Sequence, residues 1–228
     1  MAREWVTLTI KGTKFFAYVL VFFVVALVVW AQVTAPEITS ILFVLLGLVV
    51  FGILLVRAEP TQKIGWWFLG ASYVGAPIIA MWWLRTLDSG LIVLWVFFIV
   101  WATDIGGYFF GKGIGGPKLA PRISPKKTWA GLLGGMVFSI GVGLFLHLAL
   151  GLITSIWVLV VASGALAVWA QVGDLVESGV KRHFDVKDSG ELIPGHGGLL
   201  DRVDGLVFVA PAVVFLIVLF PSIFVSGP

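Results

Sequence analysis

Hydrophobic residues in this 228-residue chain fall in long runs, with the polar residues gathered between them. A helix that crosses about 30 Å of hydrocarbon needs roughly 20 mostly apolar residues. Segments of this kind are Phe15–Val33, Ile38–Val56, Gly65–Leu84, Gly90–Phe110, Trp129–Leu150, Leu152–Gly173 and Leu206–Phe224. The pattern therefore predicts an all-α, polytopic membrane protein with about seven transmembrane helices.

Composition agrees with this prediction, because 60% of the residues are hydrophobic and only 12% are charged. Soluble domains are about 25% charged. The chain has no cysteine, which excludes disulfides and thiolate metal sites. The first apolar run follows Lys11 and Lys14 but exceeds the roughly 7–15 residues of a signal-peptide core, so we expect a retained helix.

Basic residues lie almost entirely on one side of the predicted membrane. The N-terminus and the loops 57–63, 111–128 and 174–204 hold 14 of the 15 Lys and Arg residues, and Arg85 alone lies on the other side. Cytosolic loops carry such an excess. We therefore expect the N-terminus and these loops in the cytosol and the C-terminus outside. Topology then explains the net charge of +3 without a nucleic-acid partner.

The polar residues divide the chain into two regions. Residues 1–90 read as N-terminal membrane helices with little chemistry. Residues 91–228 read as a catalytic membrane region, whose cytosolic loops 111–128 and 174–204 hold most of the charge.

Candidate residues begin around the first of these loops. Asp104 lies in or at the edge of the fourth apolar segment, where an isolated carboxylate is costly unless it meets a polar cavity or a partner. Ser124 and Pro125 end the loop, and Lys126 and Lys127 directly precede the fifth segment. Two cations at that place would attract a polyphosphate or an acidic lipid headgroup. The alternatives are an interhelical hydrogen bond for Asp104 and snorkelling for the lysines.

The second loop starts with a polar helical face. Read as a helix, Asp174, Glu177, Ser178 and Lys181 fall within an arc of about 100°. A surface pair at i and i+4 is a sufficient explanation for Glu177 with Lys181. It does not explain Asp174, which lies deeper among apolar residues.

A glycine-rich turn follows. Pro194 and Gly195 should stop any regular element, and Gly195, Gly197 and Gly198 surround His196. Glycines allow positive φ, so this turn could present backbone N–H groups to an anion.

Acidic residues then begin the last helix. Asp201 and Asp204 are spaced i and i+3, and acids are favourable at a helix N-terminus in any case. That effect alone does not explain the whole polar set, which is Asp174, Asp188, Asp201 and Asp204 with Lys181, Lys187 and Arg202. Carboxylates without cysteine favour a hard cation such as Mg²⁺, and the basic residues suit a polyphosphate. The pattern predicts metal-dependent phosphoryl or nucleotidyl transfer at the cytosolic membrane surface.

The second loop resembles the phosphatidate cytidylyltransferase family, whose signature is S-x-x-K-R-x(4)-K-D-x(5)-P-x-H-G-G-x-x-D-R-x-D. It is met by Ser178, Lys181, Arg182, Lys187, Asp188, Pro194, His196, Gly197, Gly198, Asp201, Arg202 and Asp204. The stretch from Asp104 to Gly131 is similar to a second block of the family, except for Ala130, where the family often has Glu. The resemblance covers about residues 95–225. Family members are usually longer at the N-terminus, so we expect one or two fewer helices here.

The resemblance implies that CTP and phosphatidate react to give CDP-diacylglycerol and pyrophosphate, with Mg²⁺ as one cation or a pair. It leads us to expect catalytic roles for Asp174, Asp201, Asp204, Lys181 and His196, with the three aspartates as metal ligands and a turn-stabilising role as the alternative for His196. It implies substrate-binding roles for Asp104, Ser124, Lys126, Lys127, Ser178, Arg182, Lys187, Asp188, Gly197, Gly198 and Arg202. It also implies a bacterial inner-membrane location and a homodimer.

Other functions remain open at this stage. The enzyme would act on another lipid phosphate, or would be a CTP-dependent lipid kinase, if the apolar groove accepts a different lipid. An anion transporter is the alternative from another class, and we would expect its polar residues at all membrane depths. Here they crowd on one face.

Overall fold

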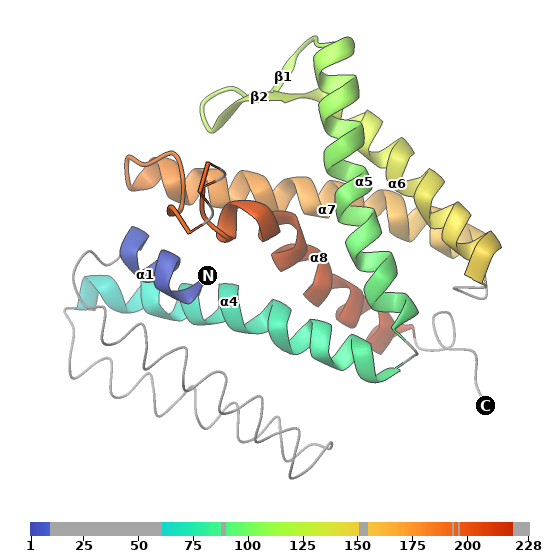
Figure 1. Ribbon diagram of the computed structural model, residues 1–228, viewed down its shortest axis with the longest axis horizontal. Helices are drawn as coiled ribbons and strands as arrows, with labels where there is room; N and C mark the ends of the chain where they lie inside the picture. Colours follow the sequence, from blue (N-terminus) through green and yellow to red (C-terminus); the bar gives the residue numbers. More distant parts are fainter. Residues whose placement is uncertain (10–60, 88–89, 151–154, 193, 196, 221–228) are drawn as a thin grey trace. The chain divides into compact units, whose positions relative to one another are not determined.

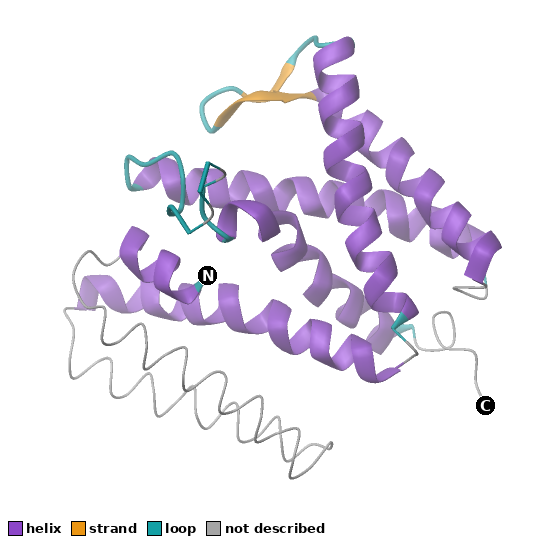
Figure 2. Ribbon diagram, in the orientation of Figure 1, coloured by secondary structure: helices purple, strands orange, loops and turns teal. Residues whose placement is uncertain are grey.

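The computed structural model describes residues 1–9, 61–87, 90–150, 155–192, 194–195 and 197–220 (Figure 1). Its elements are α1 (Ala2–Thr9), α4 (Thr61–Leu87), α5 (Leu91–Gly113), β1 (Lys118–Ala120), β2 (Ser124–Thr128), α6 (Trp129–Leu150), α7 (Ile156–His183) and α8 (Leu200–Leu219). Figure 2 shows that helix dominates the described part of the chain.

Contacts divide the chain into two compact units. The first unit combines Met1–Ile79 with Asp188–Leu200, and the second combines Ala80–Lys187 with Asp201–Pro228. The functional division expected at residue 90 stays a prediction, because these units are defined by contacts alone.

Four of the described helices, α5 to α8, are long and apolar enough to cross a membrane. They correspond to the last four predicted segments, and α6 has the predicted bounds. Helix α7 continues ten residues beyond the predicted end at Gly173, to His183. The third predicted segment is helical as part of α4, although α4 is not among these four. The first two predicted segments lie outside the described residues.

The second unit has an apolar core and an apolar outer surface. Trp95 and Ile99 of α5 are fully buried with Leu159 of α7 and Val209 of α8. Large apolar side chains also point outward, such as Trp157, which is 77% exposed. Exposed apolar side chains on long helices are what a lipid environment requires.

Small residues and hydroxyl groups join the helices of the second unit. A Cβ added at Gly106 of α5 would lie 2.6 Å from the Gly134 carbonyl of α6, so these backbones approach closely. One turn away, Thr103 and Ser139 share a hydrogen bond of 2.7 Å, and Ser139 also donates to the Ile99 carbonyl. The buried hydroxyls therefore have partners without contact with water.

The prediction of an all-α fold is wrong in one place, since the first polar loop forms a β-hairpin (Figure 2). Strands β1 and β2 pair antiparallel, with Lys118 opposite Thr128. Gly115 and Gly116 have positive φ, which lets the chain leave α5 and turn into the hairpin. Thr128 then accepts a hydrogen bond from Gly131 N at 3.1 Å and caps α6. Helix α5 thus ends at Gly113 and helix α6 begins at Trp129. The short extended segment between them folds back on itself and pairs as β1 and β2.

The first unit holds α1 against the first part of α4 (Figure 1). Trp5 is buried, its ring stacks on Tyr73 with centroids 5.0 Å apart, and its indole N–H donates to the Trp66 carbonyl at 2.9 Å. Gly70 leaves the space that the Trp5 ring occupies. One tryptophan therefore anchors α1.

Candidate active site

Helix α7 carries the polar face that the sequence predicted. Ser178 Oγ donates to Asp174 Oδ1 at 3.3 Å, and Lys181 Nζ lies 3.2 Å from Glu177 Oε1. Both pairs are one turn apart on the helix, as the spacing i and i+4 requires. Because α7 runs on to His183, these side chains lie on one rigid element rather than in a loop.

Lys181 also joins α7 to α8. Its Nζ lies 2.6 Å from Asp201 Oδ1, in the first turn of α8, so that it stands between two carboxylates. All three side chains are largely buried, and Glu177 is only 2% exposed. Among the described residues, the Glu177 oxygens have no hydrogen-bond partner beyond this ion pair. One ammonium therefore lies between two carboxyl groups, one from α7 and one from α8.

A second cluster joins four elements. Lys127 Nζ, from the end of β2, lies 2.5 Å from Asp174 Oδ2, and it also donates to the Gln171 carbonyl at 3.4 Å. Asp104 of α5 and Asp204 of α8 interact electrostatically with each other, with Asp174 and with Lys127. Three carboxyl groups thus interact electrostatically with one ammonium, and one of them, Asp174, is in direct contact with it. Such an excess of negative charge attracts cations.

Helices α7 and α8 approach each other closely next to this cluster. A Cβ added at Gly173 would lie 2.7 Å from the Asp204 carbonyl and 3.0 Å from the Phe208 ring. Only glycine fits at this crossing. Gly173 therefore sets how near its neighbour Asp174 comes to Asp204.

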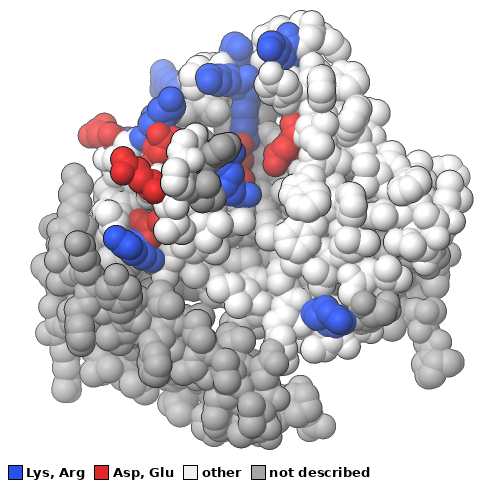
Figure 3. Space-filling view, viewed as in Figure 1, with Lys and Arg blue, Asp and Glu red and all other residues white. Residues whose placement is uncertain are grey.

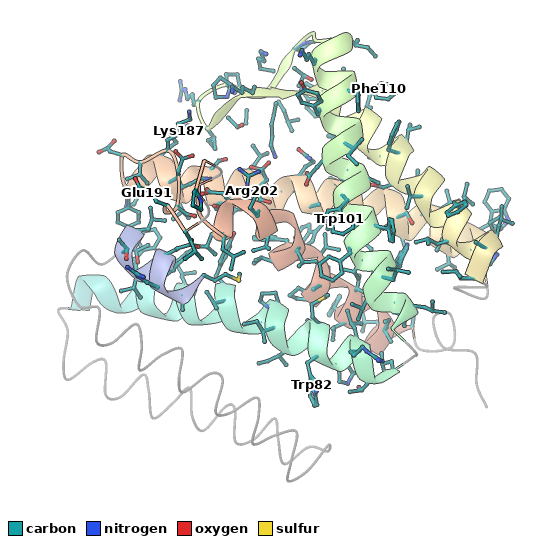
Figure 4. All side chains as sticks on the ribbon, in the orientation of Figure 1. Trp82, Trp101, Phe110, Lys187, Glu191 and Arg202 are labelled. Carbon is teal, nitrogen blue, oxygen red and sulfur yellow. The ribbon has the colours of Figure 1, made fainter. Side chains whose placement is uncertain are left out.

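Charged side chains of the second unit gather toward its hairpin end, and uncharged atoms cover most of its remaining visible face (Figure 3). Lys126 is exposed on β2, and Ser124 is half-buried at the start of that strand. Arg182 and Lys187 are exposed after the polar face of α7, and Arg182 donates to the Val186 carbonyl at 3.2 Å. Figure 4 labels Lys187 in the loop after α7 and Arg202 in the first turn of α8. These cations frame a surface suited to an anion.

The remaining predicted residues belong to the first unit. Asp188 is exposed at the start of its loop, and Gly198 is buried. Gly195 and Gly197 have positive φ, as the turn pattern predicted. His196 lies outside the described residues.

Sequence reasoning missed three features. It treated Glu177 as half of a surface pair. Glu177 lies one turn after Asp174 on the same helical face, and this position was already a signal that Glu177 is buried. It gave no role to Glu4, which contacts the glycine-rich loop. It also contained no signal that Lys127 would meet Asp174, because 47 residues separate them.

No group of three or more His, Asp or Glu side chains in the described part of the chain is close enough to hold a metal ion. Asp174 and Asp201 are instead paired with Lys127 and Lys181. The donor set still fits a hard cation chemically, because carboxylate oxygens are the ligands that Mg²⁺ prefers. The metal assignment of Asp174, Asp201 and Asp204 stays a prediction.

Four apolar helices, with acids and lysines gathered toward their ends, are typical of a polytopic membrane protein. The chain belongs to the cytidylyltransferase family, whose model matches residues 1–220.

Several relatives are named phosphatidate cytidylyltransferase. The protein of Brucella suis biovar 1 (strain 1330) is 41% identical over 203 residues, which cover 86% of this chain and 73% of the relative. That of Bacillus subtilis (strain 168) is 40% identical over 181 residues, 78% of this chain and 67% of the relative. A relative from Staphylococcus epidermidis is 46% identical over 151 residues, 66% of this chain. The match spans 57% of that relative's length.

Proposed function

We propose that this protein transfers CMP from CTP to phosphatidate, giving CDP-diacylglycerol and pyrophosphate. The main support is the ion pair between Lys127 and Asp174. It joins the Asp104–Gly131 block to helix α7, which leads into the signature that begins at Ser178. Family membership and the names of the relatives point the same way.

The chemistry needs positioning more than a strong base. A phosphate monoester has a second pKa near 6, so phosphatidate is largely dianionic at neutral pH. One of its oxygens attacks the α-phosphorus of CTP, a new P–O bond forms, and the bond to the β-phosphate oxygen breaks as pyrophosphate leaves. The enzyme must hold two anions together and neutralise the charge that develops on the leaving group.

Carboxylates supply the proposed metal site. Asp174 and Asp201 would hold Mg²⁺, as one ion or two, with Asp204 as a further ligand. The electrostatic grouping adds Asp104 as a neighbour of Asp174 and Asp204. A bound Mg²⁺ would neutralise phosphate oxygens and make the α-phosphorus more electrophilic.

Cations supply the proposed phosphate sites. Lys126 is exposed and free to meet the phosphatidate headgroup, while Lys127 lies closer to the acids. The other contributors to phosphate binding would be Ser124, Ser178, Lys181, Arg182, Lys187 and Arg202. In the first unit, the proposed substrate-binding groups are Asp188 and the backbone of Gly197 and Gly198, and His196 would protonate pyrophosphate.

The proposed location is the bacterial inner membrane, with the hairpin end of the second unit at the cytosolic face. The positive-inside distribution of Lys and Arg supports this orientation. Phosphatidate would enter from the inner leaflet, and the active form would be a homodimer.

A reconstituted assay tests the proposal. Purified protein in vesicles should release pyrophosphate from α-labelled CTP, and transfer the label to lipid, only when phosphatidate and Mg²⁺ are both present. Asp174→Asn should abolish transfer while the protein still folds. A lipid kinase would instead release CDP and leave the α-label in solution. Label transfer to other lipid phosphates at equal rates would refute the assignment of phosphatidate, and absence of any transfer would refute the enzyme.

A further inference from the structure

Glu4 connects the N-terminal helix α1 to the glycine-rich loop of the signature. Its side chain is buried, with 6% of the residue exposed. Oε1 accepts a hydrogen bond from Leu199 N at 2.8 Å, and Oε2 accepts one from Leu200 N at 3.0 Å. Oε2 also lies 3.5 Å from the amino group of Met1. The two loop contacts join residues almost 200 positions apart in the chain.

The backbone around this carboxylate leaves no spare room. A Cβ added at Gly198 would lie 2.9 Å from Gly190 N and 3.0 Å from Glu4 Oε1. A Cβ at Gly190 would lie 3.1 Å from Glu4 Cγ. The described parts of the loop that hold Gly190 and Gly198 therefore pack closely against Glu4, and a side chain at Gly198 would not fit without a shift of the backbone.

Glu4 acts as a helix cap supplied from elsewhere in the chain. The first N–H groups of a helix have no partner within the helix, and Leu200 is the first residue of α8. Glu4 accepts the N–H of Leu200 and that of Leu199, the residue before the helix, and such charge-assisted hydrogen bonds are strong and complement the helix dipole. Because Trp5 anchors α1 on α4, the carboxylate is held at a fixed place within this unit.

We propose that Glu4 is a positioning residue, which holds the loop Asp188–Leu200 in the conformation that binds substrate. This rests on the proposed function, in which the loop contributes Asp188, Gly197 and Gly198. Glu4 need not touch substrate, since it acts through the backbone of Leu199 and Leu200.

Three variants test this role. Glu4→Gln keeps the shape but replaces one acceptor oxygen with an N–H donor, which opposes the loop N–H. Glu4→Asp keeps the charge on a shorter side chain. Glu191→Gln is the matched control, because it removes an exposed carboxylate from the same loop.

The first measurement is hydrogen exchange of peptides covering residues 188–200, which needs no activity. Loss of charged hydrogen bonds should speed exchange in Glu4→Gln by about tenfold or more. Glu191→Gln should exchange like the wild type. Unchanged exchange in Glu4→Gln would overturn the inference, whether or not the protein makes CDP-diacylglycerol.

The second measurement is steady-state kinetics with CTP and phosphatidate. Glu4→Gln should lower kcat/KM for CTP by about tenfold or more, with partial recovery in Glu4→Asp and with thermal stability close to that of the control. Faster exchange with normal kinetics would refute the positioning role. An inactive wild type whose exchange still depends on Glu4 would refute the proposed function but leave the loop contact established.

Discussion

Gly173 offers a direct test of how helix packing sets the active site. Gly173→Ala would place a methyl group 2.7 Å from the Asp204 carbonyl, whereas an ordinary contact is at least 3.4 Å. The obstacle is backbone and cannot rotate away. Helices α7 and α8 must therefore separate by roughly 0.7 Å at this crossing, next to Asp174.

The cost follows from that displacement. Overpacking of a tight interior typically costs about 1–3 kcal/mol in the free energy of unfolding. Misplacement of catalytic groups by about 1 Å can cost on the order of 100-fold in rate. We therefore expect Gly173→Ala to unfold at lower temperature in detergent and to lose at least about tenfold in kcat.

Gly179→Ala is the matched control, because it makes the same change on the same helix where no atom lies within 4 Å. Alanine is the better helix former by about 1 kcal/mol, so this variant should be equally stable or more stable, with normal activity. Thermal unfolding and label transfer from CTP should be measured on both proteins. If Gly173→Ala matches Gly179→Ala in both assays, the close crossing of α7 and α8 does not set the site.

Charge changes at the two clusters give further predictions. Lys181→Met removes the ammonium that pairs with both Glu177 and Asp201 and should cost about 3–5 kcal/mol in the free energy of unfolding, whereas Glu177→Gln keeps one ion pair and should cost much less. Equal losses in the free energy of unfolding for the two variants, measured by denaturation, would contradict this prediction. Lys127→Met should lower kcat at least about 100-fold, while Lys126→Met should mainly raise the KM for phosphatidate, since only Lys127 pairs with Asp174. Identical kinetics of the two lysine variants would refute the different roles of Lys126 and Lys127. Mg²⁺ with CTP should raise the unfolding temperature of the wild type but not of Asp174→Asn, and a shift in both would refute the metal assignment.

The sequence was sufficient to predict the helices of the second unit and the polar face of α7. Long apolar runs predict transmembrane helices because the backbone must satisfy its own hydrogen bonds in lipid. The face of Asp174, Glu177, Ser178 and Lys181 follows from helical spacing alone. The loop Gly111–Thr128 is different, because hairpin pairing there depends on where α5 ends and α6 begins.

Pairing between distant motifs could not be predicted from spacing. Lys127 meets Asp174, and Glu4 meets Leu199, only because helices fix their positions in three dimensions. Glu4 in particular lies in a short amphipathic segment with no recognised motif. An acid next to a tryptophan at the start of a chain does not by itself predict that either side chain is buried or that the acid contacts a distant loop.

The depth of the polar groups bears on the choice between an enzyme and a transporter. Within the described helices of the second unit, the buried polar groups far from the hairpin include the Trp95 indole N–H, which donates to Ser163 Oγ at 3.4 Å, and His147 Nδ1, which has no hydrogen-bond partner among the described residues. The acids lie instead in the last part of α7, the first turns of α8 and the half of α5 that leads to the hairpin. A transport route needs polar contacts across the whole membrane. A reaction between a soluble nucleotide and a lipid headgroup needs them at one end of the helices, and the described acids of these helices gather in that way.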